Sequence, residues 1–218
     1  MLSRVWWLMG VGALAACAFT VLGICVGSTG FENLLQPLWY PALDPGQTAM
    51  AQQIVWEIRL PRTVGAWMAG ALLGLAGAVA QGLFRNPLAD PYLLGSASGA
   101  SLGVALALVL FGASPSTTEW VVRLGLTGAA FVGAVVAVLL TLLLARGVQQ
   151  TLRLLLAGVI VGVVLGAIKD LITLSSADVL QAIQGFMLGS TGLVGWSACA
   201  VMAAVVVVCL LLGWALAP

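Results

Sequence analysis

The run from Thr63 to Leu83 constrains this chain most, because it contains no charged side chain. As a helix it is about long enough to cross the roughly 30 Å hydrocarbon core of a bilayer. The whole chain follows the same trend: 62% of its 218 residues are hydrophobic and 7% are charged, whereas roughly 25% of a soluble domain is charged. The sequence therefore predicts an integral membrane protein of the all-α class.

Six apolar runs predict six membrane-spanning helices. Their expected bounds are residues 5–26, 63–83, 93–111, 121–144, 154–174 and 197–214. Before the second span, residues 48–58 place apolar and polar side chains on opposite faces, which predicts a short amphipathic helix on the membrane or on the protein. We expect residues 1–218 to form one transmembrane domain, a polytopic helical bundle.

Composition argues against several classes of protein. A net charge of +1 without a basic run gives no case for nucleic-acid binding. The four cysteines all lie in apolar runs without the spacing of a zinc site, so we expect them to pack as small hydrophobic residues. The absence of histidine removes the commonest general base and metal ligand. We therefore expect no catalytic residue, metal or cofactor in this chain, and no enzyme activity.

Two arginines stand at the expected start of the second span. Arg59 and Arg62 flank Pro61, which suits the first turn of a helix. A helix N-terminus disfavours cations, so their position needs a reason. Either both guanidinium groups reach lipid phosphates, or an acidic partner binds at this face of the membrane.

Small residues recur at every fourth position in the second, third and fifth spans. In the fifth span they are Gly158, Gly162 and Gly166. Such a stripe lets another helix backbone approach closely. It could instead line a narrow path for a bulky solute, and both interpretations stay open.

Lys169 and Asp170 place two charges near the end of the fifth span. Adjacent residues on a helix do not face each other, so we expect different partners for the two side chains. Charges within membrane helices are functional candidates, although side chains this close to the interface can also reach water. The next residues, 175–178, are similar to a capping box and predict a short helix that ends at about Met187.

Charge does not decide the orientation of the six spans. Basic residues are tied between the two sides, so the positive-inside rule gives no answer. One side holds Arg4, Arg85, Arg146 and Arg153, and the other holds Arg59, Arg62, Arg123 and Lys169.

Two motifs carry a resemblance to a known family. The first is Arg-Leu-Pro-Arg at 59–62, and the second is the turn that contains Arg85, Asn86, Pro87, Asp90 and Pro91. Together with the Gly-Ser-Ala-Ser-Gly-Ala run at 95–100, they resemble the FecCD/BtuC-like permease subunits of ABC importers for iron-siderophores, haem and cobalamin. The resemblance covers essentially the whole chain.

The resemblance implies an architecture and a set of partners. A full member has about ten membrane helices and pairs with a second permease subunit, commonly as a homodimer, in the inner membrane. Two cytoplasmic ATPase subunits consume the ATP, and a periplasmic solute-binding protein delivers the cargo. The N-terminus would be cytoplasmic, with Arg59 and Arg62 outside, where they would contact the binding protein. The fifth helix, with Gly158, Gly162 and Gly166, and the short helix at 177–187 would line the pathway.

The expected function is that of a permease for ferric siderophores or a related metal chelate. A haem or cobalamin permease is the nearest alternative, and a non-transporting membrane scaffold is an alternative of another class. The chain ends after the sixth expected span. We therefore expect it to be the amino-terminal part of a longer permease or a truncated product.

Overall fold

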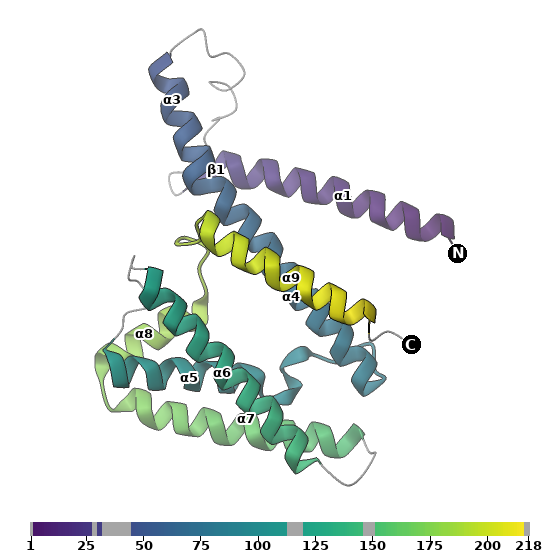
Figure 1. The fold of residues 1–218 in the computed structure, drawn as a ribbon, viewed down its shortest axis with the longest axis vertical. Coiled ribbons are helices and arrows are strands. Elements are labelled where there is room, and N and C mark those ends of the chain that lie inside the picture. Colours follow the sequence, from purple (N-terminus) through teal and green to yellow (C-terminus); the bar gives the residue numbers. More distant parts are fainter. Residues whose placement is uncertain (1, 28–29, 32–44, 113–119, 146–150, 216–218) are drawn as a thin grey trace. The chain divides into compact units, whose positions relative to one another are not determined.

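The computed structural model describes residues 2–27, 30–31, 45–112, 120–145 and 151–215 of the chain, and most of these residues are helical (Figure 1). The helices are α1 (Leu2–Cys25), α3 (Pro45–Gln53), η1 (Ile54–Arg59), α4 (Leu60–Phe84), η2 (Pro91–Leu94), α5 (Ser96–Phe111), α6 (Trp120–Leu144), α7 (Thr151–Leu174), α8 (Ala177–Leu188) and α9 (Trp196–Ala215). Two short strands, β1 (Val26–Gly27) and β2 (Gly30–Phe31), pair antiparallel after α1.

The helices confirm the all-α membrane fold. Four of them are long and apolar enough to cross a membrane: Thr48–Phe84, Leu124–Leu144, Leu152–Leu174 and Trp196–Ala215. Two shorter apolar helices, Met9–Cys25 and Ser96–Phe111, lie at the first and third predicted spans. Each predicted span thus coincides with an apolar helix.

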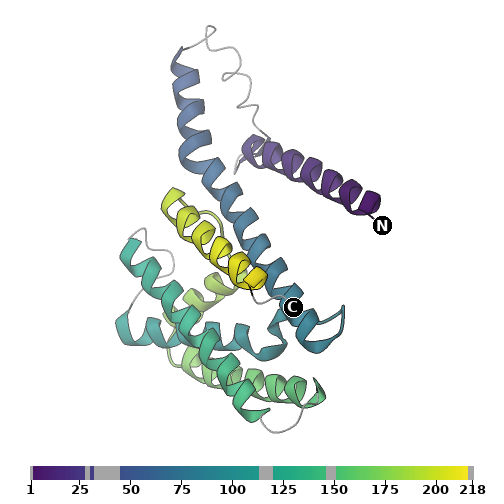
Figure 2. The same ribbon diagram turned by 45° about the vertical axis from the view of Figure 1, so that its right-hand side comes forward.

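The second span is longer than the sequence predicted. Residues 48–84 form one continuous helix from α3 through η1 to α4, which both views show (Figures 1 and 2). The prediction of a separate amphipathic helix at 48–58 was therefore wrong. So was the placement of Arg59 and Arg62 at a helix N-terminus, because both lie inside this helix.

A π-helical turn carries the helix past Pro61. In η1 the amide of Leu60 donates to the carbonyl of Val55, five residues back. A proline inside a regular α-helix clashes with the carbonyl four residues before it and has no amide to donate. The wider π turn relieves that conflict without ending the helix.

The contacts within the chain divide it into two compact units. The first contains residues 1–72 and 191–218, and the second contains residues 73–190. In the first unit, Gly23 lies against Thr63 and Gly65 lies against Val194; a Cβ at either glycine would be 2.6 Å from the neighbouring side chain. Glycine therefore allows these segments to approach closely.

The second unit has a helical core built from α5, α6 and α8. Its buried side chains are Val104, Ala105, Ala107, Leu108, Leu126 and Ile183. Ile183, on the short helix α8, is only 2% exposed. Where α5 crosses α6, Gly99 and Gly133 bring their backbones into direct contact. The small-residue stripe of the third span thus packs against α6, as the sequence predicted for such stripes.

Candidate functional site

The motif turn at residues 85–91 joins α4 to η2. Arg85 adopts a left-handed conformation with φ of 49°. The side chain of Asn86 accepts from the amide of Leu88 at 2.9 Å, and that of Asp90 accepts from the amide of Tyr92 at 2.7 Å. Asparagine and aspartate favour turns through these local bonds, and Pro91 suits the first turn of η2. In this chain the motif residues therefore shape a turn.

The turn places residues 93–95 directly against α7. The carbonyl of Leu93 occupies the space that a Cβ on Gly158 would need. Gly95 has φ of 76°, and a Cβ there would be 3.2 Å from the amide nitrogen of Gly162. Thr141 on α6 donates to the carbonyl of Leu94 at 2.9 Å and completes the junction. Close packing is thus what the structure shows for Gly158 and Gly162.

A groove of about 460 Å³ runs along this same junction. It is lined by Asp90, Tyr92, Leu93, Gly95, Ser98, Gly158, Val159, Gly162 and Val163. Gly166 lies one turn beyond Gly162, and a Cβ there would be 4.0 Å from the hydroxyl of Ser98. The glycine stripe of α7 therefore borders a groove while it packs, so the two interpretations do not exclude each other.

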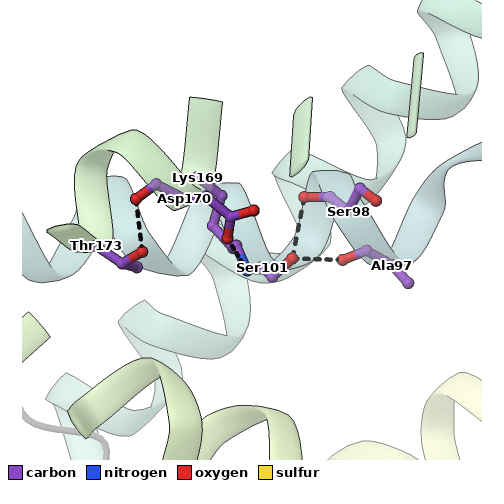
Figure 3. A network of polar contacts seen from close by, with 6 residues as sticks. All are labelled: Ala97, Ser98, Ser101, Lys169, Asp170 and Thr173. Atoms are coloured by element: carbon purple, nitrogen blue, oxygen red, sulfur yellow. Dashed lines mark hydrogen bonds and ion pairs between the residues drawn. The ribbon is translucent and has the colours of Figure 1, made fainter. Parts of the chain in front are cut away.

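Lys169 and Asp170 form an ion pair with each other. The Lys169 Nζ lies 2.7 Å from the Asp170 Oδ1, while the side chains are 14% and 66% exposed (Figure 3). The prediction of separate partners was wrong. The long lysine side chain lies largely buried, and its flexible end reaches back to the neighbouring carboxylate. Nearby, the hydroxyl of Ser101 donates to the carbonyls of Ala97 and Ser98 at 2.9 and 3.1 Å (Figure 3).

The two arginines of the 59–62 motif have different surroundings. Arg59 is 8% exposed, and its Nη1 donates at 2.6 Å to the carbonyl of Ile24 in the last turn of α1. A cation is favoured at a helix C-terminus, where carbonyls lack helical partners. Arg62 is exposed. Docking of a binding protein by these two residues stays a prediction.

Trp196 makes a structural contact in the first unit that the sequence analysis missed. The carbonyl of Trp56 would accept from Leu60 in an α-helix, but that amide donates to Val55. Five residues after Trp56 stands Pro61, which has no amide. The indole nitrogen of Trp196 donates to this carbonyl at 2.8 Å, and the two indole rings lie 5.3 Å apart. The available sequence signal for this bond was Pro61, which has no amide to donate to the Trp56 carbonyl. The sequence does not indicate which group supplies the missing donor.

The short helix α8 was predicted at nearly the right place but with the wrong cap. Ser176 is its N-cap residue and makes no side-chain capping bond. Ser175 instead donates to the carbonyl of Ile172 at 2.6 Å. The capping box at 175–178 was therefore wrong, because the first serine closes the end of α7.

Within the described ranges, no three histidine, cysteine, aspartate or glutamate side chains gather as a metal site would require. The site is thus a set of packed helices, a groove and one ion pair. Comparison with known proteins gives this arrangement a context. The model of the FecCD transport family matches residues 5–218. The chain belongs to the FecCD transport family. This confirms the resemblance of the 59–62 and 85–91 motifs, and the family is one of transport proteins rather than enzymes.

Individual relatives of this FecCD-family chain agree with the match. It is 38% identical over 193 residues to the vitamin B12 import system permease protein BtuC of Salmonella paratyphi A, which covers 87% of this chain and 53% of the relative. The protein of the same name from Salmonella typhi gives the same values. The chain thus spans about half the length of the curated relatives it matches.

A solved structure of the metal-chelate type of ABC transporter, in an inward-facing conformation, shares the fold. The TM-score is 0.73 with 27% identity, over 94% of this chain and 60% of that one. The polytopic membrane fold of the FecCD-family chain is therefore supported by sequence and by structure.

Proposed function

We propose that this FecCD-family chain is a permease component of a binding-protein-dependent ABC importer, with corrinoids of the vitamin B12 type as cargo. The observation that carries the proposal is its 38% identity to vitamin B12 import permeases over 87% of the chain. Ferric siderophores, the cargo expected from the sequence, become the second candidate. The likeness to a transporter of the metal-chelate type supports keeping them.

The partners follow from the class of transporter. A second permease subunit, most simply another copy, would share the pathway, and cytoplasmic ATPase subunits would bind and hydrolyse ATP. Rocking of the two permease subunits would then open the pathway to each side in turn. The chain itself would contribute helices and surfaces but no catalytic group and no cofactor.

The groove beside α7 supports a place on the pathway for Gly158, Gly162 and Gly166. Small residues leave room beside the helix, and the groove is lined by the first two of them.

Docking of the periplasmic binding protein is proposed for the exposed Arg62. Arg59 would support that surface indirectly, because its guanidinium holds the end of α1. This assignment places the 59–62 motif outside the inner membrane and the N-terminus in the cytoplasm.

Reconstitution tests the function. The complete permease, with its ATPase and binding protein, is placed in proteoliposomes, and uptake of labelled cyanocobalamin and of a labelled ferric siderophore is measured with and without ATP. We expect ATP-dependent accumulation of cyanocobalamin. Uptake of the siderophore alone would favour the second candidate, and no uptake of either chelate by an assembled complex would favour the membrane scaffold.

A further inference from the structure

Lys169 and Asp170 are the charges that interrupt the apolar part of α7. The helix is uncharged from Leu154 to Ile168 and again from Leu171 to Leu174. At 1.5 Å per residue, Asp170 lies about 6 Å before the last residue of a helix long enough to cross a membrane. The pair is therefore close to the inner edge of the interfacial region.

The carboxylate of Asp170 faces away from the rest of its unit. The side chain is 66% exposed, and its Oδ1 is held by Lys169. Among the residues that the structure describes, its Oδ2 has no partner within hydrogen-bonding distance. A carboxylate is strongly disfavoured against lipid and in membrane helices faces a water-filled cavity or a polar partner. The exposed carboxylate of Asp170 is thus unsuited to direct contact with lipid.

The same face of α7 borders the groove. Val163 and Val159 precede Asp170 by seven and eleven residues, which are close to two and three helical turns. Both valines line the groove. Gly166 lies between them and the carboxylate, with Ser98 nearby. Asp170 therefore lies on the face of α7 that borders the groove, about 10 Å along the helix from Val163.

Lys169 and Asp170 together carry no net charge, but the ammonium does not cover the carboxylate. Its ammonium binds one carboxylate oxygen, while only 14% of its side chain is exposed (Figure 3). The exposed surface of the pair is consequently a hydrogen-bond acceptor.

We propose that Asp170 is a specificity-determining residue that contacts the transported chelate. Its exposed oxygen would accept hydrogen bonds from amide groups, and this exposed negative end of the ion pair would repel anions. The pathway would then favour neutral chelates rich in amides and disfavour polyanionic ones such as ferric tris-catecholates. The inference rests on the proposed function, because it needs α7 to border the transport path.

The test compares two chelates in the complete reconstituted transporter. ATP-dependent uptake of cyanocobalamin and of a ferric tris-catecholate, each supplied with a binding protein that retains it, is measured for wild type and Asp170→Asn. We expect the ratio of cyanocobalamin to catecholate uptake to fall about tenfold in the variant, the size expected for removing one charge at several ångströms in a partly hydrated site. The exchanged pair K169D/D170K should leave the ratio at least as low.

Two further variants separate selection from folding. Asp170→Glu keeps the charge and should keep the wild-type ratio, whereas Glu57→Gln removes an exposed charge in η1 and should also leave the ratio unchanged. A ratio within twofold of wild type in both Asp170→Asn and the exchanged pair would overturn the inference while leaving the proposed function intact. If wild type transports neither chelate, the proposed function itself fails.

Discussion

Glycine residues that look alike in the sequence meet different surroundings in the structure. A Cβ on Gly158 would occupy the position of the Leu93 carbonyl, whereas a Cβ on Gly77 would have no atom within 4 Å in the described part of the chain. Both glycines lie within long helices of the second unit. The packing therefore requires glycine at position 158, whereas it has room for a larger residue at position 77.

Gly158→Ala should destabilise the protein by about 1–3 kcal/mol, the usual cost of forcing extra atoms into a packed site. The backbone carbonyl of Leu93 cannot move aside as a flexible side chain could. Thermal unfolding of the purified protein in detergent measures the change. Gly77→Ala is the matched control and should be neutral or stabilising by up to about 1 kcal/mol, because alanine favours a helix. Equal stability of the two variants would contradict the packing described for α7.

At the scale of an element, the helix from α3 to α4 depends on contacts from outside it. The π turn and Pro61 leave the carbonyl of Trp56 without a helical donor, and Trp196 on α9 supplies one. In the same region of the helix, the guanidinium of Arg59 donates a hydrogen bond to the end of α1. This segment is thus where three helices of the first unit are joined.

Trp196→Phe should cost about 0.5–1.5 kcal/mol, the usual net value of one hydrogen bond, because it keeps an aromatic ring but removes the indole donor to the Trp56 carbonyl. Chemical or thermal unfolding in detergent measures the loss. Trp67→Phe removes an indole donor to the hydroxyl of Thr20, which still donates to the carbonyl of Ala16, and should cost less.

A second substitution tests whether the indole hydrogen bond compensates for the missing amide of Pro61. Pro61→Ala restores a backbone amide at the position that the π turn leaves without one. In that background, Trp196→Phe should cost at least about 0.5 kcal/mol less than in wild type, since the carbonyl of Trp56 gains a helical donor. Strictly additive effects in the double-mutant cycle would show that the indole bond is not linked to the proline.

At the scale of the whole molecule, the two arginines of the 59–62 motif should act differently on assembly. Arg62 is exposed and free to meet a partner from outside, whereas Arg59 is buried against the end of α1. A charge at the edge of an interface mainly affects the rate and salt dependence of association. Reversal of the exposed charge should therefore weaken docking without unfolding the permease.

Arg62→Glu should weaken binding of the periplasmic binding protein about tenfold at low salt and by less at high salt, where charges are screened. Binding to right-side-out membrane vesicles measures the effect and tests the orientation as well. Arg153→Glu is a matched control at an exposed position in the first turn of α7, on the proposed cytoplasmic side. Unchanged binding for Arg62→Glu would mean that the arginine only anchors the helix to lipid, and binding confined to inside-out vesicles would reverse the proposed orientation.

The sequence analysis predicted local features well where one residue type has one consequence. Each of the six predicted apolar runs coincides with an apolar helix, and the turn residues Asn86, Asp90 and Pro91 lie in the turn expected of them. The sequence analysis was wrong where a side chain has several possible interaction partners. Lys169 was expected to find a partner apart from Asp170, but the length of its side chain allowed an ion pair with the adjacent residue.

By itself, the sequence determined that the chain is a membrane-embedded helical protein of a transport family, because hydrophobicity, helix length and motif residues act along the chain. Only the tertiary structure decided that the helix continues through Pro61, that Arg59 and Arg62 differ in exposure, and that Trp196 completes the π turn. The physical reason is the same in each case. The buried guanidinium of Arg59 and the free carbonyl of Trp56 are satisfied by groups from distant parts of the chain, and the sequence of the helix does not indicate which groups these are.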